Sequence, residues 1–156
     1  LCAAAAAQGA FVPFGTGCSW NGQALAIGNV GLPAVGATFQ ITYSGPNWAF
    51  NSAQQIAQPN LVLGFGAQTF PIPVGFLPQQ PAGCTGYIAP DIVVPMAVNR
   101  ATGLFETFLD VAVPPDPALV GFTAYAQWLT VLQQCGFAGC GNAAFLTSDA
   151  AIAVIG

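Results

Sequence analysis

The chain has 156 residues, of which 54% are hydrophobic and 4% are charged, and it carries one arginine, no lysine and no histidine. This composition excludes histidine general bases, lysine Schiff bases and histidine metal sites, and it argues against disorder, which needs low hydrophobicity and high charge. The formal net charge of −4 leaves no basic stripe for nucleic acid, and no apolar run is long enough for a membrane span.

Short β-strand patterns fill the chain, and Gly or Pro interrupts nearly every gap between them. The clearest runs from Ala37 to Ser44, where apolar and polar residues alternate without a fault before the turn signal Gly45-Pro46. The expected strands are 9–14, 23–27, 37–44, 61–65, 69–74, 85–89, 92–98, 104–113, 120–132 and 143–155. We therefore predict an all-β chain with one domain at 11–156, an antiparallel β-sandwich or jelly-roll-like fold.

Two of these strands, 104–113 and 120–132, carry large apolar groups on both faces. A strand with one face in water should be more polar on its outer side. Either loops of the same chain cover the second face, or another subunit does.

Residues 1–10 are interpreted as an extended N-terminal arm, although their small residues also resemble the tail of a signal peptide. Such an arm can dock on its own domain or complete the open sheet edge of a neighbour. The residues expected to make intermolecular contacts are Leu1, Cys2, Phe11, Val12 and Phe14. The alternative for 10–14 is the first strand of the chain's own sandwich.

The five cysteines include no Cys-x2-Cys pair, so a structural zinc site is a poor interpretation and disulfides fit better. Cys135 and Cys140 bracket a tight Gly-Phe-Ala-Gly loop, and Cys18 with Cys84 is the remaining natural pair. Cys2 is left over as a free thiol or as half of an intermolecular bridge. Disulfides predict an extracellular location.

The acidic residues are too few and too scattered to predict an enzyme. Glu106 and Asp110 share a strand face but lie about 13 Å apart, too far for a glycosidase pair. Asp91 and Asp116 adjoin prolines, where carboxylates commonly cap turns, and Asp149 is unassigned. A calcium ion on one carboxylate is chemically allowed, but no cofactor, metal site or catalytic residue is predicted.

Aromatic side chains could form a platform for neutral glycans. Trp128 lies in a long apolar run and is better explained as core. Trp20 and Trp48, in Gly- and Asn-rich segments, are the better candidates for exposed contact. The other aromatics considered are Tyr43, Tyr87 and Tyr125.

Several short motifs follow one another along the chain. They are Phe14-Gly15-Thr16-Gly17-Cys18, Gly31-Leu32-Pro33-Ala34-Val35-Gly36, Leu61-Val62-Leu63-Gly64-Phe65, Gly83-Cys84, Pro115-Asp116-Pro117-Ala118-Leu119-Val120-Gly121 and Gln127-Trp128. Together they resemble a set of uncharacterised secreted bacterial β-sandwich domains, over about residues 11–156. The resemblance implies secretion and a bridge between Cys18 and Cys84, and it implies no catalytic residue.

From these features we expect a structural subunit of a secreted, self-assembling filament or surface layer, held by arm exchange and apolar packing. Its expected partners are copies of itself. The alternative is a secreted carbohydrate-binding or adhesive module.

Overall fold

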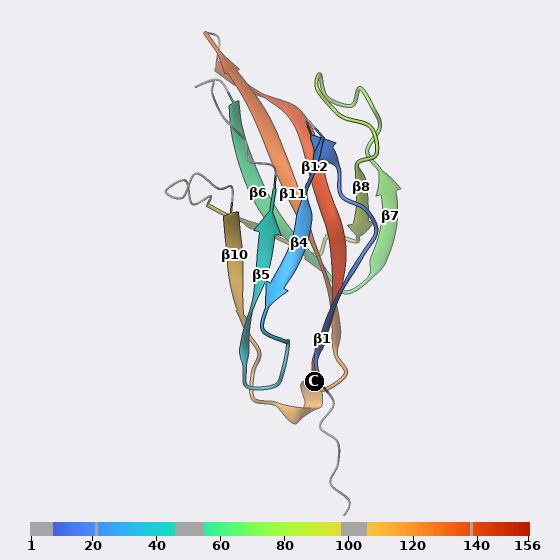
Figure 1. The fold of residues 1–156 in the computed structure, drawn as a ribbon, viewed down its shortest axis with the longest axis vertical. Helices are drawn as coiled ribbons and strands as arrows, with labels where there is room; N and C mark the ends of the chain where they lie inside the picture. The colour runs from blue at the N-terminus through green and yellow to red at the C-terminus, as the bar shows by residue number, and fades with distance from the viewer. Residues whose placement is uncertain (1–7, 21, 46–54, 98–105, 138) are drawn as a thin grey trace, which may run out of the picture.

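The computed structural model describes residues 8–20, 22–45, 55–97, 106–137 and 139–156. The described chain is an antiparallel β-sandwich, as predicted, with a five-stranded sheet in the order β1-β12-β11-β6-β9 and a three-stranded sheet in the order β10-β5-β4 (Figure 1). Two further antiparallel pairs, β2-β3 and β7-β8, complete it.

The strands and the one 3-10 helix have the following bounds: β1 (Ala10–Phe14), β2 (Ser19–Trp20), β3 (Gln23–Ala24), β4 (Ala26–Val30), β5 (Thr38–Ser44), β6 (Gln55–Gly64), β7 (Ala67–Pro71), β8 (Thr85–Ile88), β9 (Ile92–Pro95), β10 (Glu106–Ala112), η1 (Pro117–Leu119), β11 (Thr123–Gly136) and β12 (Gly139–Val154). Among the described residues no helix is long and apolar enough to cross a membrane.

The alternation predicted for β5 is confirmed by its burial. Phe39, Ile41 and Tyr43 are buried, while the residues between them are at least partly exposed. Both neighbouring strands pair with β5 along its length, since β4 lies on one side and β10 on the other. β5 is therefore the central strand of the smaller sheet, and its alternate side chains form one wall of the core.

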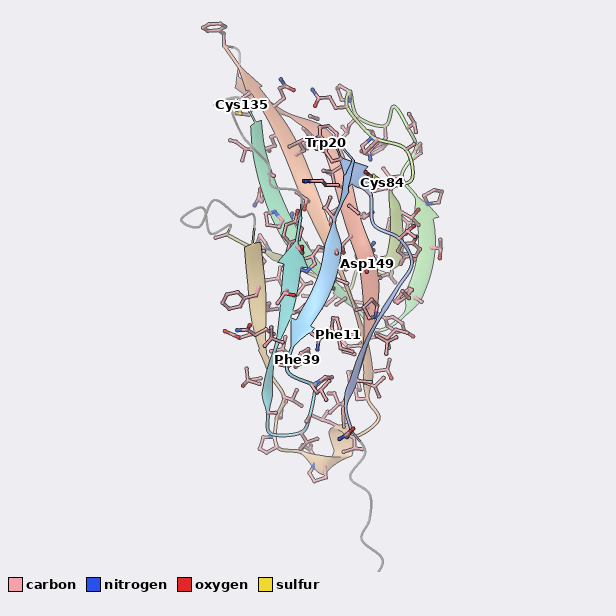
Figure 2. All side chains as sticks on the ribbon, viewed as in Figure 1. Phe11, Trp20, Phe39, Cys84, Cys135 and Asp149 are labelled. Carbon is pink, nitrogen blue, oxygen red and sulfur yellow. A yellow bond between two sulfur atoms is a disulfide. The ribbon has the colours of Figure 1, made fainter. Side chains whose placement is uncertain are left out.

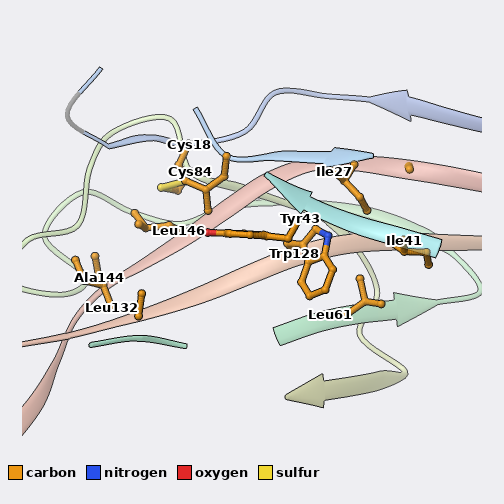
Figure 3. Packing of buried hydrophobic residues seen from close by; sticks show 14 of the residues in the cluster. Cys18, Ile27, Ile41, Tyr43, Leu61, Cys84, Trp128, Leu132, Ala144 and Leu146 are labelled. Carbon is orange, nitrogen blue, oxygen red and sulfur yellow. A yellow bond between two sulfur atoms is a disulfide. The ribbon is translucent and has the colours of Figure 1, made fainter. Parts of the chain in front are cut away.

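Trp128 of β11 stands at the centre of the core between the two sheets and is completely buried (Figure 3). Its ring lies edge-on against Tyr43, with ring centroids 5.5 Å apart. Its indole N–H donates to the Thr42 carbonyl at 2.9 Å, and the Thr130 hydroxyl donates to the Tyr43 hydroxyl at 3.1 Å. These bonds satisfy polar groups that would otherwise be costly to bury, so the prediction that Trp128 is a core residue is confirmed.

β1 forms an edge of the five-stranded sheet, where residues Ala10 to Phe14 pair with Val154 to Ala150 of β12. Phe11 packs against the core and lies 6.4 Å from Phe39 between ring centroids. Residues 10–14 therefore form a strand of their own sandwich, the second of the two alternatives. Residues 1–7, with Leu1 and Cys2, lie outside the described residues.

β6 begins at Gln55, well before the predicted start at residue 61. The early part was missed because it is polar and contains Pro59, and a proline normally argues against a central strand. Here Pro59 uses its carbonyl instead, which accepts a hydrogen bond from Met96 N at 3.0 Å. The early part pairs with β11 up to Gln55 opposite Gln134.

The predicted strand at 23–27 is two strands, because the chain changes partner at Leu25. β3 pairs with β2, and β4 pairs with β5. Leu25 itself is buried between them, and its N–H donates to the Cys18 carbonyl at 3.1 Å.

The predicted strands at 120–132 and 143–155 continue much further toward each other than expected. Their ladder runs to Gly136 opposite Gly139, so β11 and β12 form one long hairpin. In Figure 1 this hairpin rises to one end of the molecule, and the C-terminus lies at the other end.

Candidate functional site

An apolar groove of about 490 Å³ lies between the β7-β8 pair and the outer face of the five-stranded sheet. The sheet contributes Val62, Val93, Gln127, Leu129, Phe145 and Thr147. The β7-β8 side contributes Phe70, Pro71, Ile72, Pro73, Phe76, Gly86, Ile88 and Pro90. None of these described lining residues is charged. We call this feature the apolar groove.

The sheet side of the groove follows from strand alternation. Leu61, Trp128 and Leu146 are fully buried in the core between the sheets. Successive residues of a strand point to opposite faces, so their neighbours Val62, Gln127 and Phe145 point outward. The second face of β11 is thus covered in part by the chain itself, through β7 and β8, and the groove is the part left open.

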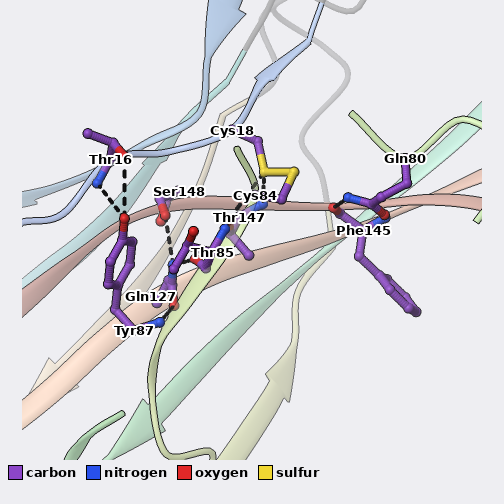
Figure 4. The surroundings of a disulfide bond; sticks show 10 residues. All are labelled: Thr16, Cys18, Gln80, Cys84, Thr85, Tyr87, Gln127, Phe145, Thr147 and Ser148. Atoms are coloured by element: carbon purple, nitrogen blue, oxygen red, sulfur yellow. Dashed lines mark hydrogen bonds between the residues drawn. A yellow bond between two sulfur atoms is a disulfide. The ribbon is translucent and has the colours of Figure 1, made fainter. Parts of the chain in front are cut away.

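Gln127 anchors β8 on this outer face and is itself buried (Figure 4). Its side-chain N–H groups donate to the carbonyls of Thr85 at 2.9 Å and Ser148 at 2.8 Å. Its side-chain oxygen accepts from Tyr87 N at 2.9 Å. Because both N–H groups and the oxygen of the side-chain amide already make these hydrogen bonds, Gln127 lines the groove without contributing a polar binding group.

The disulfide between Cys18 and Cys84 lies beside this anchor, with both cysteines buried. Thr147 N donates to Cys18 Sγ at 3.1 Å, and Thr85 N donates to the Thr147 hydroxyl at 3.2 Å. The bridge therefore ties β2 and β8 to the same part of β12, and the predicted pairing is confirmed.

Phe76 and Phe145 pack against each other in the lining of the groove, with ring centroids 5.9 Å apart. The buried Gln80 side chain holds this part of β12 by donating to the Phe145 carbonyl at 2.7 Å and accepting from Phe145 N at 2.9 Å. Phe70, another lining residue, packs so closely on Gly86 that a side chain at Gly86 would overlap its ring. The shape of the groove therefore depends on the backbone at Gly86 and Phe145 as well as on the lining side chains.

A second feature is the end of the β11-β12 hairpin, residues Cys135–Cys140, which we call the hairpin tip. The predicted disulfide between Cys135 and Cys140 is confirmed, and these two residues are register partners across the ladder. Phe137 lies between them and is fully exposed. Figure 2 labels Cys135 near the end of the hairpin, away from the body of the sandwich.

The described carboxylates act as hydrogen-bond acceptors within the fold. Asp116 accepts from Ala118 N at 2.9 Å and caps η1, which confirms the predicted turn capping. Asp91 accepts from Phe65 N at 2.9 Å, and Asp110 accepts from the Gln40 amide at 2.9 Å. No cluster of three metal-ligating residues occurs within the described part of the chain.

Asp149 and Tyr87 have shifted pKa values. Burial raises the pKa of Asp149, although Ile27 N donates to its carboxylate at 2.8 Å and opposes the shift. Hydrogen bonds with Thr16 lower the pKa of Tyr87, whose hydroxyl accepts from Thr16 N at 3.1 Å. Asp149 thus connects β12 to β4, and Tyr87 connects β8 to the segment that follows β1.

The described aromatic residues considered for a glycan platform do not form one exposed surface. Trp128 and Tyr43 are in the core, and Trp20 is partly buried and packs against it, so the prediction of an exposed Trp20 is wrong. Tyr87 and Tyr125 both contact Phe14, with ring centroids 5.9 Å and 6.3 Å apart. Trp48 and Arg100 lie outside the described residues.

The residues predicted to make intermolecular contacts are thus divided. Phe11 and Phe14 pack within their own chain, whereas Val12 is 52% exposed. A contact of any of them with a second copy stays a prediction. Sequence reasoning missed the groove and Phe137, although an aromatic residue inside a Cys-Gly bracket is a visible signal.

No protein-family model, no curated protein and no solved structure matches the chain. The resemblance to secreted bacterial β-sandwich domains therefore stays a prediction that rests on the motifs quoted above.

Proposed function

We propose that this protein is a structural subunit that self-associates outside the reducing cytosol through apolar contacts. The observation that carries the proposal is the exposure of large hydrophobic side chains on a surface with almost no charge. Those exposed are Val12, Val30, Leu32, Ile56, Phe65, Phe70, Val74, Phe76, Ile92, Val93, Phe108, Val120, Phe122 and Phe137. Single exposed apolar side chains are common on protein surfaces, but where several adjoin one another they mark an interaction site.

Several of these side chains lie together. Phe70, Phe76 and Val93 are exposed by 40%, 59% and 53% and line the apolar groove. Phe65 and Phe122 contact each other, with ring centroids 5.8 Å apart. Association through such groups removes apolar surface from water, and this gain scales with the area buried.

The two disulfides support a location outside the cytosol, because such bonds form and persist in oxidising compartments. A catalytic function receives less support, since the described carboxylates are occupied by the fold's own hydrogen bonds. Glycan binding also receives less support, because, of the described candidates, Tyr43 and Trp128 are in the core, whereas Tyr87 and Tyr125 pack against Phe14.

Sedimentation velocity of the purified protein over a range of concentrations tests the proposal. We expect the mean mass to rise with concentration and to persist or increase in sulfate salts, which strengthen apolar association. Negative-stain microscopy would then distinguish filament, layer and ring. A monomer at every concentration and salt would contradict the proposal.

Arm exchange by residues 1–7 is a separate part of the proposal. β1 pairs with β12 without those residues, so a chain lacking 1–7 should still fold. If arm exchange connects the subunits, this variant stays monomeric. If the variant still assembles, apolar packing is sufficient and the arm is not the connector.

A further inference from the structure

We propose that Phe137 at the hairpin tip of one copy inserts into the apolar groove of the next copy. This inference rests on the proposed self-association and names the two surfaces that make it. Each copy would donate one tip and accept one tip.

The hairpin tip has the properties of an anchor. Phe137 is fully exposed in the described structure, and a disulfide joins the strands on either side of it. The ladder continues from the body of the sheet to the Gly136–Gly139 pair. The bridge and the ladder restrain the backbone on either side of Phe137, so less backbone freedom is lost on binding, and aromatic anchors dominate many interfaces.

The apolar groove has the chemistry that would accept such an anchor. Its volume of about 490 Å³ lies within the range of small-molecule sites, and it is larger than one aromatic ring requires. The Gln127 amide is already paired, and the Thr147 hydroxyl already accepts a hydrogen bond from Thr85 N. An occupant therefore gains from burying apolar surface and needs no polar partner.

The two surfaces also avoid the charges of a chain whose net charge is −4. Residues 133–142, which include the hairpin tip, contain no charged residue, and neither does the groove lining. Association through these two surfaces brings no carboxylate into the contact, so no charge has to be desolvated.

The contact has to form between copies. Phe145 in the groove wall lies six residues along β12 from Gly139, which corresponds to about 20 Å of extended strand. The paired ladder holds the tip at that distance from its own groove. A contact between two different surfaces is heterologous, so it propagates into a filament unless the rotation closes a ring.

Two variants and two matched controls test the inference by sedimentation velocity. F137S removes the anchor, and V93E places a carboxylate at the groove; both original side chains are at least half exposed, so both variants should fold. The controls are F108S on β10 and V30E on β4, whose original side chains are 51% and 59% exposed and lie outside both surfaces. We expect F137S and V93E to weaken association about 30-fold or more, as loss of an interface anchor does, and the controls to assemble like the wild type.

Mixing the two defective variants gives the sharper result. F137S keeps an intact groove and V93E keeps an intact tip, so one contact can form between them and cannot propagate. We expect a one-to-one dimer from two monomeric proteins. If the wild type assembles but F137S also assembles, or the mixture stays monomeric, this inference is overturned while the proposed self-association stands. If the wild type itself stays monomeric, both fail.

Discussion

The two disulfides close loops of very different length in very different surroundings. Cys18 and Cys84 are 66 residues apart and both are buried beside Gln127 and Thr147, where β8 meets β12. Cys135 and Cys140 are five residues apart at the end of a hairpin, where Cys140 is exposed. The first bridge belongs to the packing of the sandwich body, whereas the second holds one turn that projects from it.

This contrast shows that the sequence separation of a disulfide predicts its effect on the unfolded chain, whereas its surroundings predict its effect on the folded structure. Closing a long loop restricts the unfolded chain more than closing a short one does, and a buried bridge also contributes packing. A short exposed bridge restricts the unfolded chain little, so its main effect is on local order in the folded state.

The largest effect is expected from the double variant C18S/C84S. The loop-entropy relation gives a loss of about 4 kcal/mol in the free energy of unfolding, which denaturant unfolding measures directly. Such a loss is a large part of the total stability of a domain. A loss no greater than that of C135S/C140S would show that the two bridges are equivalent.

The next largest effect is expected at Gln127 in the same region. The variant Q127L leaves Tyr87 N and the carbonyls of Thr85 and Ser148 without this partner. Burying polar groups without partners predicts a loss of about 3 kcal/mol in the free energy of unfolding.

Q40L is the matched control for Q127L, because the Gln40 amide donates to Asp110 at an exposed position. A surface change of this kind is expected to stay within about 0.5 kcal/mol. Equal losses for Q127L and Q40L in the same denaturant experiment would contradict the anchoring role of Gln127.

The double variant C135S/C140S should cost at most about 2 kcal/mol, since the closed loop is short. The more specific expectation is local. Hydrogen exchange should accelerate at residues 133–142. It should stay unchanged in β5 and in the half of β11 that begins at Thr123. Faster exchange throughout the sandwich would mean that the tip bridge supports the whole body.

The smallest effect is expected from Asp149, whose pKa is raised in the folded state by burial. A raised folded pKa means that the folded chain binds the proton more tightly than the unfolded chain does. The contribution of Asp149 to stability is therefore full below the ordinary pKa value of 3.8 and is lost as pH rises through the folded pKa.

The variant D149N should lack this decline and keep an acceptor for Ile27 N. Unfolding midpoints of both proteins over that pH range measure the difference. The same pH dependence in both would place the effect at another carboxylate.

Strand alternation was readable from the sequence because it is local. The pattern of Phe39, Ile41 and Tyr43 predicts a strand with one buried face, and burial follows it. The disulfide pairings were also predicted, since a tight Gly-rich loop identifies one pair, and Cys18 with Cys84 is both the natural pair among the other three cysteines and the bridge that the resemblance implies. Capping by Asp116 followed from the flanking prolines.

Other features depend on contacts between distant segments. The ends of β11 and β12 read as a polar, Gly-rich loop, and only their pairing with each other and with β6 makes them strands. Trp20 lies in a segment that reads as exposed, yet it packs against the core. Local composition does not specify which surface a short segment will meet.

The sequence by itself thus determined the all-β class, the two bridges and the presence of apolar groups on both faces of β11. Alternation states which residues share a face, but it does not state what covers that face. Only the tertiary structure decided this, by laying β7 and β8 over Gln127 and leaving the apolar groove beside them. The reason is physical: coverage is set by hydrogen bonds between segments about 40 residues apart in the chain, which no local pattern encodes.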